Sequence, residues 1–315
     1  MSIIRIENLT KIYSSNNPSQ PSIKALNEIS FQVPEKSIYG FLGPNGAGKS
    51  TTIGIIFQFL FQNSGKVYLF DREVTPQSIN TLKRQIGFIP DATLPKIEGY
   101  KLLSHTGKYF GLQGSQLKRR ILEVVKTTEI ESFITRKTDT LSKGQKQRIK
   151  IANSLMNDPI LLIADEPTSG IDPVGRKQFL SLIQRLVKER EKTVFLSSHV
   201  IGEVEKISNQ VAILNKGDVV AKGTIDSILS KLPLTNRYRL IADGTTSEFL
   251  GTLSGVNEVQ EELSGQYLIE TTNGNKLYPK FLQEVLDTNS IRVNAFSREN
   301  VSLESAFFEY IKNNN

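Results

Sequence analysis

The sequence contains no cysteine. Disulfide bonds, thiol chemistry and metal sites built from thiolates are therefore excluded, and the absence suits a reducing compartment. Long apolar runs are missing too: the longest, Ile53–Phe61, contains Gly54 and Gln58 and is far shorter than the roughly 20 apolar residues of a membrane-spanning helix. The opening residues, Met1–Glu7, are typical of a strand and not of a secretory signal. We expect that this polypeptide does not cross a membrane by itself.

Clustering of basic residues is also missing. The 39 lysines and arginines exceed the 32 acidic residues and give a net charge of +7, which by itself would suit a nucleic-acid or membrane-surface partner. The basic residues are scattered, however, and no basic segment is interleaved with aromatic residues. We interpret the excess as a solvated surface and expect no nucleic-acid partner, while weak attraction to an anionic cytoplasmic leaflet stays open.

A glycine-rich segment is the most specific feature that the sequence does contain. It reads Gly43, Pro44, Asn45, Gly46, Ala47, Gly48, Lys49, Ser50 and Thr51, which fits the phosphate-loop pattern of glycine, four free positions and Gly-Lys-Ser/Thr. A strand-like run, 37–42, precedes it and a helix-like run, 52–60, follows. In that context backbone N–H groups converge on phosphate oxygens, Lys49 reaches the β- and γ-phosphates, and Ser50 can ligate Mg²⁺. The alternative is a turn with Lys49 in solvent, but the full match favours a nucleoside triphosphate site.

Two carboxylates follow a second buried strand. Ile160–Ala164 is a continuous apolar run, as in a parallel strand covered on both faces, and Asp165 and Glu166 come directly after it. Because ligands of open α/β sheets bind at the carboxyl ends of the strands, we expect Asp165 to hold Mg²⁺ and Glu166 to polarise the attacking water. The alternative is a helix-capping aspartate beside a surface glutamate.

Two ring-bearing residues have open roles at this point. His199 follows the apolar strand Thr193–Ser197, so a contact with the γ-phosphate and a structural role are equally supported. Tyr13 precedes a loop rich in Ser, Asn and Pro, 14–22. It can stack on an adenine or pack at the end of its strand, and the residue alone favours packing.

The order of elements predicts an α/β fold with a mixed sheet. Apolar residues at helical spacing predict a helical subdomain, about 92–150, inserted between strands. Its helices are expected at 99–110, 116–127 and 145–155. Strands at 210–214 and 219–221, joined by a hairpin turn, close the sheet.

The pattern changes beyond Lys222. Strands and helices alternate there in the β-α-β-β-α-β order of a ferredoxin-like α+β domain, and a further helix is expected over 302–311. The strands are predicted at 237–242, 256–261, 266–271 and 291–296, and the helices at 247–253 and 277–286. We therefore expect a first domain over 1–227 and a small accessory or regulatory domain over 228–315, which the length of 315 residues allows.

Five ordered motifs resemble those of the ATP-binding cassette (ABC) subunits of ABC transporters, across residues 3 to about 222. They are a Walker A loop at Gly43–Thr51, an LSGGQ-like signature at Leu141–Gln145, a Walker B strand with its catalytic glutamate at Ile160–Glu166, a D-loop at Ser169–Pro173 and an H-loop at Ser198–His199. Tyr13 stands where the family has its adenine-stacking aromatic, so the resemblance favours stacking. The C-terminal extension, ending in Ser302–Glu309, is similar to that of ABC-2 type exporters.

The sequence departs from the family pattern at two positions. Lys143 replaces a glycine of the signature, while Ser142 and Gly144 are retained. Asp91 stands at the Q-loop position, where the family usually has Gln. A shorter, charged side chain reaches less far towards Mg²⁺ and water, which puts the usual roles of that Gln in doubt.

The resemblance implies a P-loop ATPase that works as a head-to-tail dimer. Lys49, Ser50, Asp165 and Glu166 of one subunit would hold ATP and Mg²⁺, while Ser142, Gly144 and Gln145 of a second subunit, identical or not, face the triphosphate. Asp172 lies in the D-loop, and His199 would steady the γ-phosphate during hydrolysis by Glu166. The partner is a separate transmembrane permease, and the location is the cytoplasmic face of the membrane, peripheral through that permease.

Two other functions compete with the transporter ATPase. A soluble ABC ATPase that acts on nucleic acid or ribosomes usually carries two cassettes or a long coiled-coil insertion, and this chain has only one phosphate loop. A phosphate-loop kinase would leave the signature and the Asp165-Glu166 pair unexplained. We therefore predict the ATPase subunit of an exporter.

Overall fold

The computed structural model describes residues 2–14, 21–230, 237–271, 284–285, 288, 291–298 and 302–307. The chain divides into two compact units, Met1–Ile225 and Asp226–Glu309. No helix within the described ranges is long and apolar enough to cross a bilayer.

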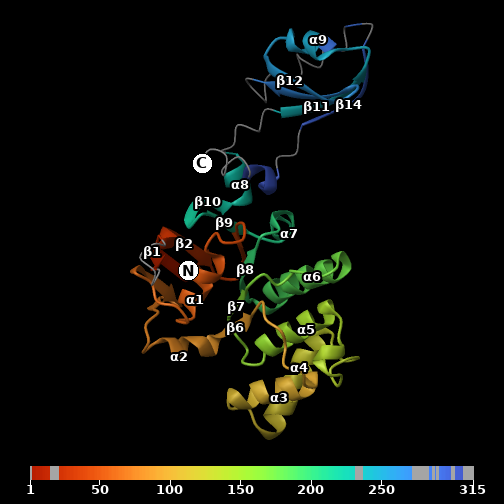
Figure 1. Cartoon of the computed structure of the whole chain (residues 1–315). Helices are drawn as coiled ribbons and strands as arrows, with labels where there is room; N and C mark the ends of the chain where they lie inside the picture. Colours follow the sequence, from red (N-terminus) through yellow and green to blue (C-terminus); the bar gives the residue numbers. More distant parts are fainter. Residues whose placement is uncertain are drawn as a thin grey trace. The chain divides into compact units, whose positions relative to one another are not determined.

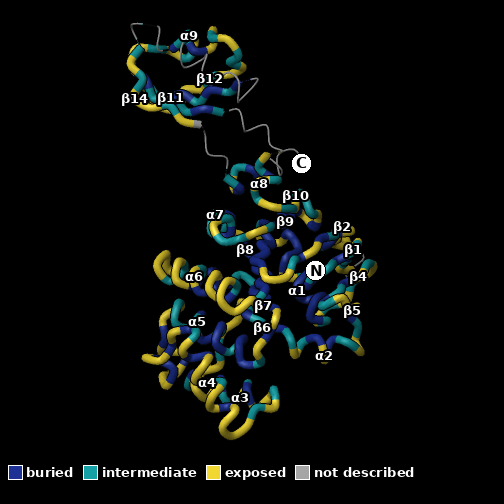
Figure 2. Tube along the Cα trace, turned by 180° about the vertical axis from the view of Figure 1, so that it is seen from behind, coloured by how far each residue is buried: buried dark blue, intermediate teal, exposed yellow. Residues whose placement is uncertain are grey.

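A six-stranded sheet forms the centre of the first unit (Figure 1). Its order is β10-β9-β3-β8-β7-β6, and all neighbours are parallel except the hairpin of β9 and β10. The strands are β3 (Ile38–Leu42), β6 (Ile86–Ile89), β7 (Leu161–Ala164), β8 (Thr193–Ser198), β9 (Gln210–Asn215) and β10 (Asp218–Thr224). Every residue of β3, β7 and β8 is buried, as expected for parallel strands covered on both faces, and Figure 2 shows this buried centre in dark blue.

A second, antiparallel sheet packs on the first. Its order is β2-β1-β4-β5, formed by β1 (Ser2–Tyr13), β2 (Ile23–Pro34), β4 (Ser64–Leu69) and β5 (Arg72–Glu73). Phe31 of β2 lies between Tyr39 and Phe41 of β3 and Phe195 of β8, with ring centroids 5.1–6.0 Å apart. Burial raises the pKa of Tyr39. This aromatic cluster packs β2 of the second sheet against β3 and β8 of the first.

The helix after the glycine-rich segment differs from its prediction. We expected an apolar helix over 52–60, but α1 begins at Lys49 and ends at Ile56. Gln58 takes a left-handed backbone conformation, with φ of 56°, which a helix cannot continue through. The N–H groups of Phe59 and Leu60 turn back to the carbonyl of Gly54, and Phe59 is left exposed.

The predicted helical insertion is confirmed between β6 and β7. It contains α3 (Gly99–Tyr109), α4 (Gly114–Thr128) and α5 (Lys143–Ser154), which gather at the lower end of the first unit in Figure 1. The other α-helices in the described part of this unit are α2 (Ile79–Leu82), α6 (Pro173–Arg190) and α7 (Ile201–Glu205), and α8 (Ile225–Leu229) spans the boundary with the second unit.

Glu129, which follows α4, joins three helices. Its carboxylate accepts hydrogen bonds from Arg148 of α5 at 2.8 Å and Arg185 of α6 at 2.7 Å. These two guanidinium groups hold the pKa of Glu129 below its ordinary value. The N-terminal end of α5 is therefore carried on a rigid three-helix support.

The second unit contains an antiparallel sheet with the strand order β12-β13-β11-β14. Its described elements are β11 (Arg237–Asp243), α9 (Ser247–Gly251), β12 (Val256–Leu263), β13 (Gln266–Thr271) and β14 (Arg292–Arg298). This is the order of a ferredoxin-like sheet, and its core contains Leu240, Tyr267 and Ile269. The helix predicted over 277–286 lies outside the described residues except for Glu284 and Val285, which are helical. Of the helix predicted over 302–311, residues 303–307 are helical and 308–311 lie outside the described part.

Candidate active site

The glycine-rich segment connects the end of β3 with the first residue of α1, in the strand–loop–helix order that was predicted. Gly48 has a φ of 111°, and a Cβ atom added there would lie 2.6 Å from Leu26 and 2.7 Å from the carbonyl oxygen of Ala25. Only glycine fits this position, because both the backbone conformation and the space exclude a side chain. The turn of β9 and β10 supports the loop, since the Gly217 N–H donates to the carbonyl of Ala47 at 3.1 Å.

Lys49 curls over its own loop and is buried, with 5% of the residue exposed. Its Nζ donates to the carbonyl oxygens of Gly43 at 2.7 Å and Pro44 at 3.1 Å. The alternative in which Lys49 extends into solvent is therefore wrong. Asn45, Gly46 and Ser50 are exposed at the same loop, where a ligand can reach them.

Asp165 and Glu166 follow β7 and share one hydroxyl group. Ser197, near the end of β8, donates from Oγ to Asp165 Oδ1 at 2.6 Å and accepts from the Glu166 N–H at 3.0 Å. Glu166 has a φ of 44°, a conformation that costs a non-glycine residue roughly 1–3 kcal/mol. The Ser197 contact holds this backbone conformation in place, and Ser197 was not identified from the sequence.

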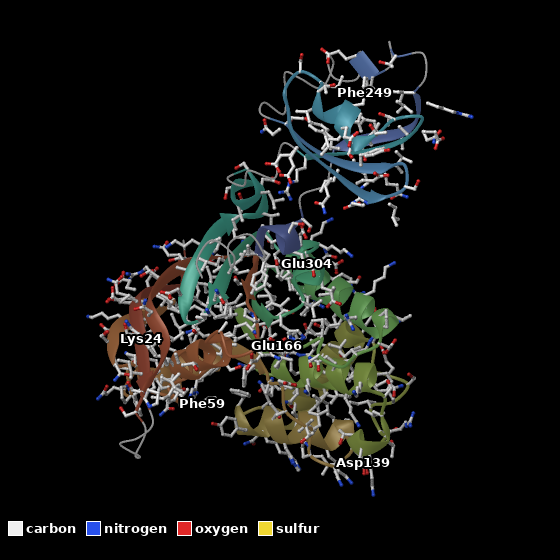
Figure 3. The ribbon with its side chains drawn as sticks, turned by 45° about the horizontal axis from the view of Figure 1, so that its top comes forward. Lys24, Phe59, Asp139, Glu166, Phe249 and Glu304 are labelled. Carbon is white, nitrogen blue, oxygen red and sulfur yellow. The ribbon has the colours of Figure 1, made fainter. Side chains whose placement is uncertain are left out.

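Glu166 lies near the middle of the first unit (Figure 3). The two oxygens of its carboxylate have different surroundings. His199 donates to Oε2 from ring Nδ1 at 2.7 Å and from its backbone N–H at 3.3 Å. Lys49 Nζ forms an ion pair with Oε1 at 3.0 Å, and the buried Oε1 accepts no hydrogen bond. The structure thus brings Lys49, Asp165, Glu166 and His199 together at one sheet edge, as the sequence predicted.

Tyr13 lies at the end of β1 and next to α1. Its hydroxyl is 3.4 Å from Oγ1 of Thr51, and 39% of the residue is exposed. Lys11 places Nζ 5.1 Å from the centroid of the tyrosine ring. The ring is therefore available to a planar ligand at the edge of the loop, which agrees with stacking and not with a packed core residue.

The signature segment begins α5 through a capping box. Ser142 Oγ accepts from the Gln145 N–H at 3.2 Å, and Gln145 Oε1 accepts from the Ser142 N–H at 3.0 Å. This arrangement starts the helix two residues earlier than predicted. Within the described part of the chain, no hydrogen bond or ion pair joins Ser142, Gly144 or Gln145 to the glycine-rich segment.

Lys143 lies along the D-loop of the same chain. Gly170 has a φ of 67°, and a Cβ added there would lie 3.0 Å from Nζ of Lys143. Asp172 caps α6 by accepting from the Gly175 N–H at 3.1 Å. Signature and D-loop are therefore neighbours, although 27 residues of sequence separate Lys143 from Gly170.

Asp91, at the Q-loop position, is exposed just beyond β6. The residue before it, Pro90, accepts a hydrogen bond from Nζ of Lys150 at 3.0 Å. Lys150 belongs to α5, so the segment after β6 is attached to the signature helix. No sequence pattern identifies Lys150 as part of the site, because a lysine in an amphipathic helix is usually solvated.

Comparison with known proteins agrees with these motifs. A family model described as ABC transporter matches residues 26–169. The linearmycin resistance ATP-binding protein LnrL of Bacillus subtilis is 34% identical over 72% of this chain and 71% of its own length. The bacitracin transport ATP-binding protein BcrA of Enterococcus faecalis is 32% identical over 72% and 70%, respectively. A dimeric, post-hydrolysis structure of the ATP-binding cassette MJ0796 with ADP and Pi has a TM-score of 0.63 at 26% identity, covering 70% of this chain and 98% of that one.

Proposed function

Because the chain belongs to the ATP-binding, ATP-hydrolysing subunits of ABC transporters, we propose that it powers export through a separate membrane permease. One observation supports ATP hydrolysis at this site. Glu166 Oε1 is a buried carboxylate oxygen that lies beside the phosphate loop and accepts no hydrogen bond. Once the Lys49 ammonium turns to the phosphates, this oxygen can accept a proton from water. The names of two relatives, a linearmycin resistance protein and a bacitracin transport protein, support export.

We assign triphosphate binding to the glycine-rich segment. Its N–H groups and the N-terminus of α1 favour phosphate oxygens, and Lys49 exchanges its loop carbonyls for the β- and γ-phosphates. Tyr13 stacks on the adenine. Each contact is made by a residue that the structure holds at the rim of the same loop.

The donor set fits Mg²⁺. Within the described residues no group of three or more His, Asp or Glu side chains could hold a metal, but Mg²⁺ is commonly bound by one or two carboxylates together with phosphates and water. Ser50 and Asp165 supply a hydroxyl and a carboxylate oxygen, both hard ligands. Mg²⁺ would offset the negative charge of the transferred phosphoryl group.

Hydrolysis is assigned to Glu166 as general base, with Oε1 accepting the proton of the attacking water. Ser197 fixes the backbone of Glu166, and His199 fixes the orientation of its carboxylate through Oε2. The second ring nitrogen of His199 is left for the γ-phosphate, and donation from both nitrogens requires the protonated ring.

The signature segment faces the triphosphate of a second subunit. Gly144 supports this, because a Cβ added there would meet nothing closer than Gly175 Cα, at 3.7 Å. The fold of this chain therefore does not require glycine at position 144. We infer that the close approach of a ligand on a second subunit requires it. Ser142 Oγ is only an acceptor in its capping box, which leaves its hydroxyl hydrogen for a phosphate oxygen.

A groove beside α3 is assigned to the permease. It has a volume of about 580 Å³ and lies between the segment after α1, β6 and α3, with Phe57, Phe59, Lys83, Phe88, Tyr109 and Phe110 among its lining residues. Phe59 is 62% and Tyr109 is 85% exposed, which is costly for large rings without a partner. We place the subunit at the cytoplasmic face through this contact, and we assign residues 228–315 to an accessory or regulatory domain.

The test is the substitution Glu166→Gln. The amide cannot accept a proton, but it keeps the size of the side chain. We expect ATP affinity within about threefold of wild type, a fall in ATPase kcat of at least 10²-fold, the lower end of what a catalytic general base contributes, and an ATP-dependent dimer on size-exclusion chromatography with light scattering.

Glu205→Gln, an exchange of the same kind outside the site, is the control and should leave kcat unchanged. Near-normal turnover of the Glu166 variant would refute the assignment of the base. Recovery of ribosomes instead of an integral membrane protein from a detergent extract would refute the transporter role.

A further inference from the structure

Lys150 is an unusual residue for its place in the fold. It lies in α5 between Ile149 and Ile151, both of which are fully buried, and it is itself only partly exposed. Its Nζ reaches across to β6 and donates to the carbonyl of Pro90 at 3.0 Å. An ammonium group therefore sits at the junction of the helical subdomain and the sheet.

This position is unfavourable for an unassisted charge. Burial lowers the pKa of Lys150, and the nearby Asp91 carboxylate opposes that effect by favouring the ammonium form. A neutral side chain of similar length would avoid the desolvation penalty. A charge kept at this position suggests a role other than stability.

Two parts of the site meet at Lys150. Ser142 lies eight residues earlier on the same helix, which is about 12 Å along a rigid axis. On the other side, β6 ends at Ile89, whose carbonyl accepts from the Asp165 N–H at 3.0 Å. The segment that leads to Asp91 is thus attached to the carboxylate strand by its backbone and to the signature helix by Lys150.

We propose that Lys150 is a positioning residue that couples Asp91 to the signature segment. The ammonium holds the Pro90 carbonyl, and with it the start of the segment that contains Asp91, to α5. A displacement of Asp91 when nucleotide binds is then transmitted along α5 to Ser142 and Gly144. The proposal rests on the assigned function, since it concerns how the two halves of the ATP site move together.

Lys150→Met tests the coupling, because it keeps the length of the side chain and removes the charge. We expect ATPase kcat to fall about tenfold, within the range typical of coupling between sites, with the KM for ATP within twofold of wild type. The thermal midpoint should not fall, since a desolvated charge is removed. Lys118→Met, at an exposed position of α4, is the matched control and should change neither value, and Lys150→Arg should restore most of kcat.

A double-mutant cycle of Lys150→Met with Asp91→Asn tests whether Asp91 and Lys150 act together. The double variant should be no slower than the slower single variant, because both residues then act through the same attachment of the segment after β6 to α5. Effects that multiply, an unchanged kcat in Lys150→Met, or a fall in thermal midpoint that accounts for the lost activity would each overturn the coupling.

Hydrogen–deuterium exchange without nucleotide separates this inference from the assigned function. Lys150→Met should increase exchange both in residues 91–97 and in residues 142–146, and an increase in one segment alone would contradict the coupling. A wild-type protein that binds no ATP would refute the assigned function, while this exchange measurement would still decide whether Lys150 joins the two segments.

Discussion

At the scale of single residues, the site depends on side chains that hold other side chains. Ser197 bridges Asp165 and Glu166, and His199 holds one oxygen of Glu166 so that the other faces the phosphate loop. The strained backbone of Glu166 is maintained by these contacts. Three hydrogen bonds with Ser197 and His199, at the end of β8 and just beyond it, therefore determine where the Glu166 carboxylate points.

Tyr13 offers a direct test of adenine stacking. Tyr13→Ala should weaken ATP binding by about 1–3 kcal/mol, the range for stacking of a base on an aromatic ring, and Tyr13→Phe should bind nearly as wild type. Isothermal titration with ATP and with a triphosphate that lacks a base would measure this. The base-free ligand should not distinguish the variants, and an unchanged ATP affinity for Tyr13→Ala would return Tyr13 to a structural role.

The residues that form the site were largely predictable from the sequence, but the residues that position them were not. Glycine spacing and the two acids after a buried strand reveal chemistry directly, because few residue types can perform it. Ser197 and Lys150 have ordinary residue types for their positions, and their contacts join segments that are 31 and 60 residues apart. Such contacts arise only when the chain folds.

At the scale of elements, α5 begins with a stabilising capping box but has a glycine, a poor helix former, in its first turn. The Ser142–Gln145 capping box satisfies two N–H groups, and loss of such a cap typically costs about 1 kcal/mol. Gly144 follows in the first turn, although every residue type except proline is a better helix former than glycine.

Gly144→Ala should therefore change stability and activity in opposite directions. The free energy of unfolding should rise by up to about 1 kcal/mol, because alanine favours the helix and the site has room for its methyl group. ATPase activity should fall by 10-fold or more if the triphosphate of a second subunit approaches this backbone. Urea unfolding and steady-state ATPase measurements would establish both values.

Gly251→Ala is the matched control, since a Cβ there also meets no neighbour. It should leave ATPase activity unchanged. A fully active Gly144→Ala variant would contradict the placement of Gly144 at a subunit interface.

Among the elements, the buried strands were predicted best and helix ends worst. An apolar run such as Ile160–Ala164 can be little else than a covered strand, and β7 occupies Leu161–Ala164. The predicted end of α1 was wrong, because an apolar sequence does not reveal the left-handed backbone conformation at Gln58. The predicted start of α5 was two residues too late, because the capping box was not identified.

At the scale of the whole molecule, the groove beside α3 is the surface that we assign to the permease. Tyr109→Ala combined with Phe59→Ser should abolish co-purification with the permease from detergent extract, because both exposed rings are lost. The ATPase activity of the isolated subunit should stay within about twofold, since neither residue belongs to the nucleotide site.

Leu122→Ala is the control, because Leu122 is equally exposed, at 70%, but lies on α4 outside the groove. It should leave co-purification intact. Permease recovered at wild-type yield with the double variant would place the contact elsewhere on the subunit.

The ion pair between Lys49 and Glu166 has a consequence for the resting subunit. One ammonium group cannot neutralise the catalytic carboxylate and a γ-phosphate at the same time. While the loop is empty, the Lys49 ammonium stays 3.0 Å from Glu166 Oε1, the oxygen to which we assign the proton of the attacking water. In the proposed cycle the arriving triphosphate draws the ammonium away and leaves Oε1 open to that water. Binding of ATP is then itself the event that removes Lys49 from the catalytic oxygen, so an empty subunit keeps its base occupied.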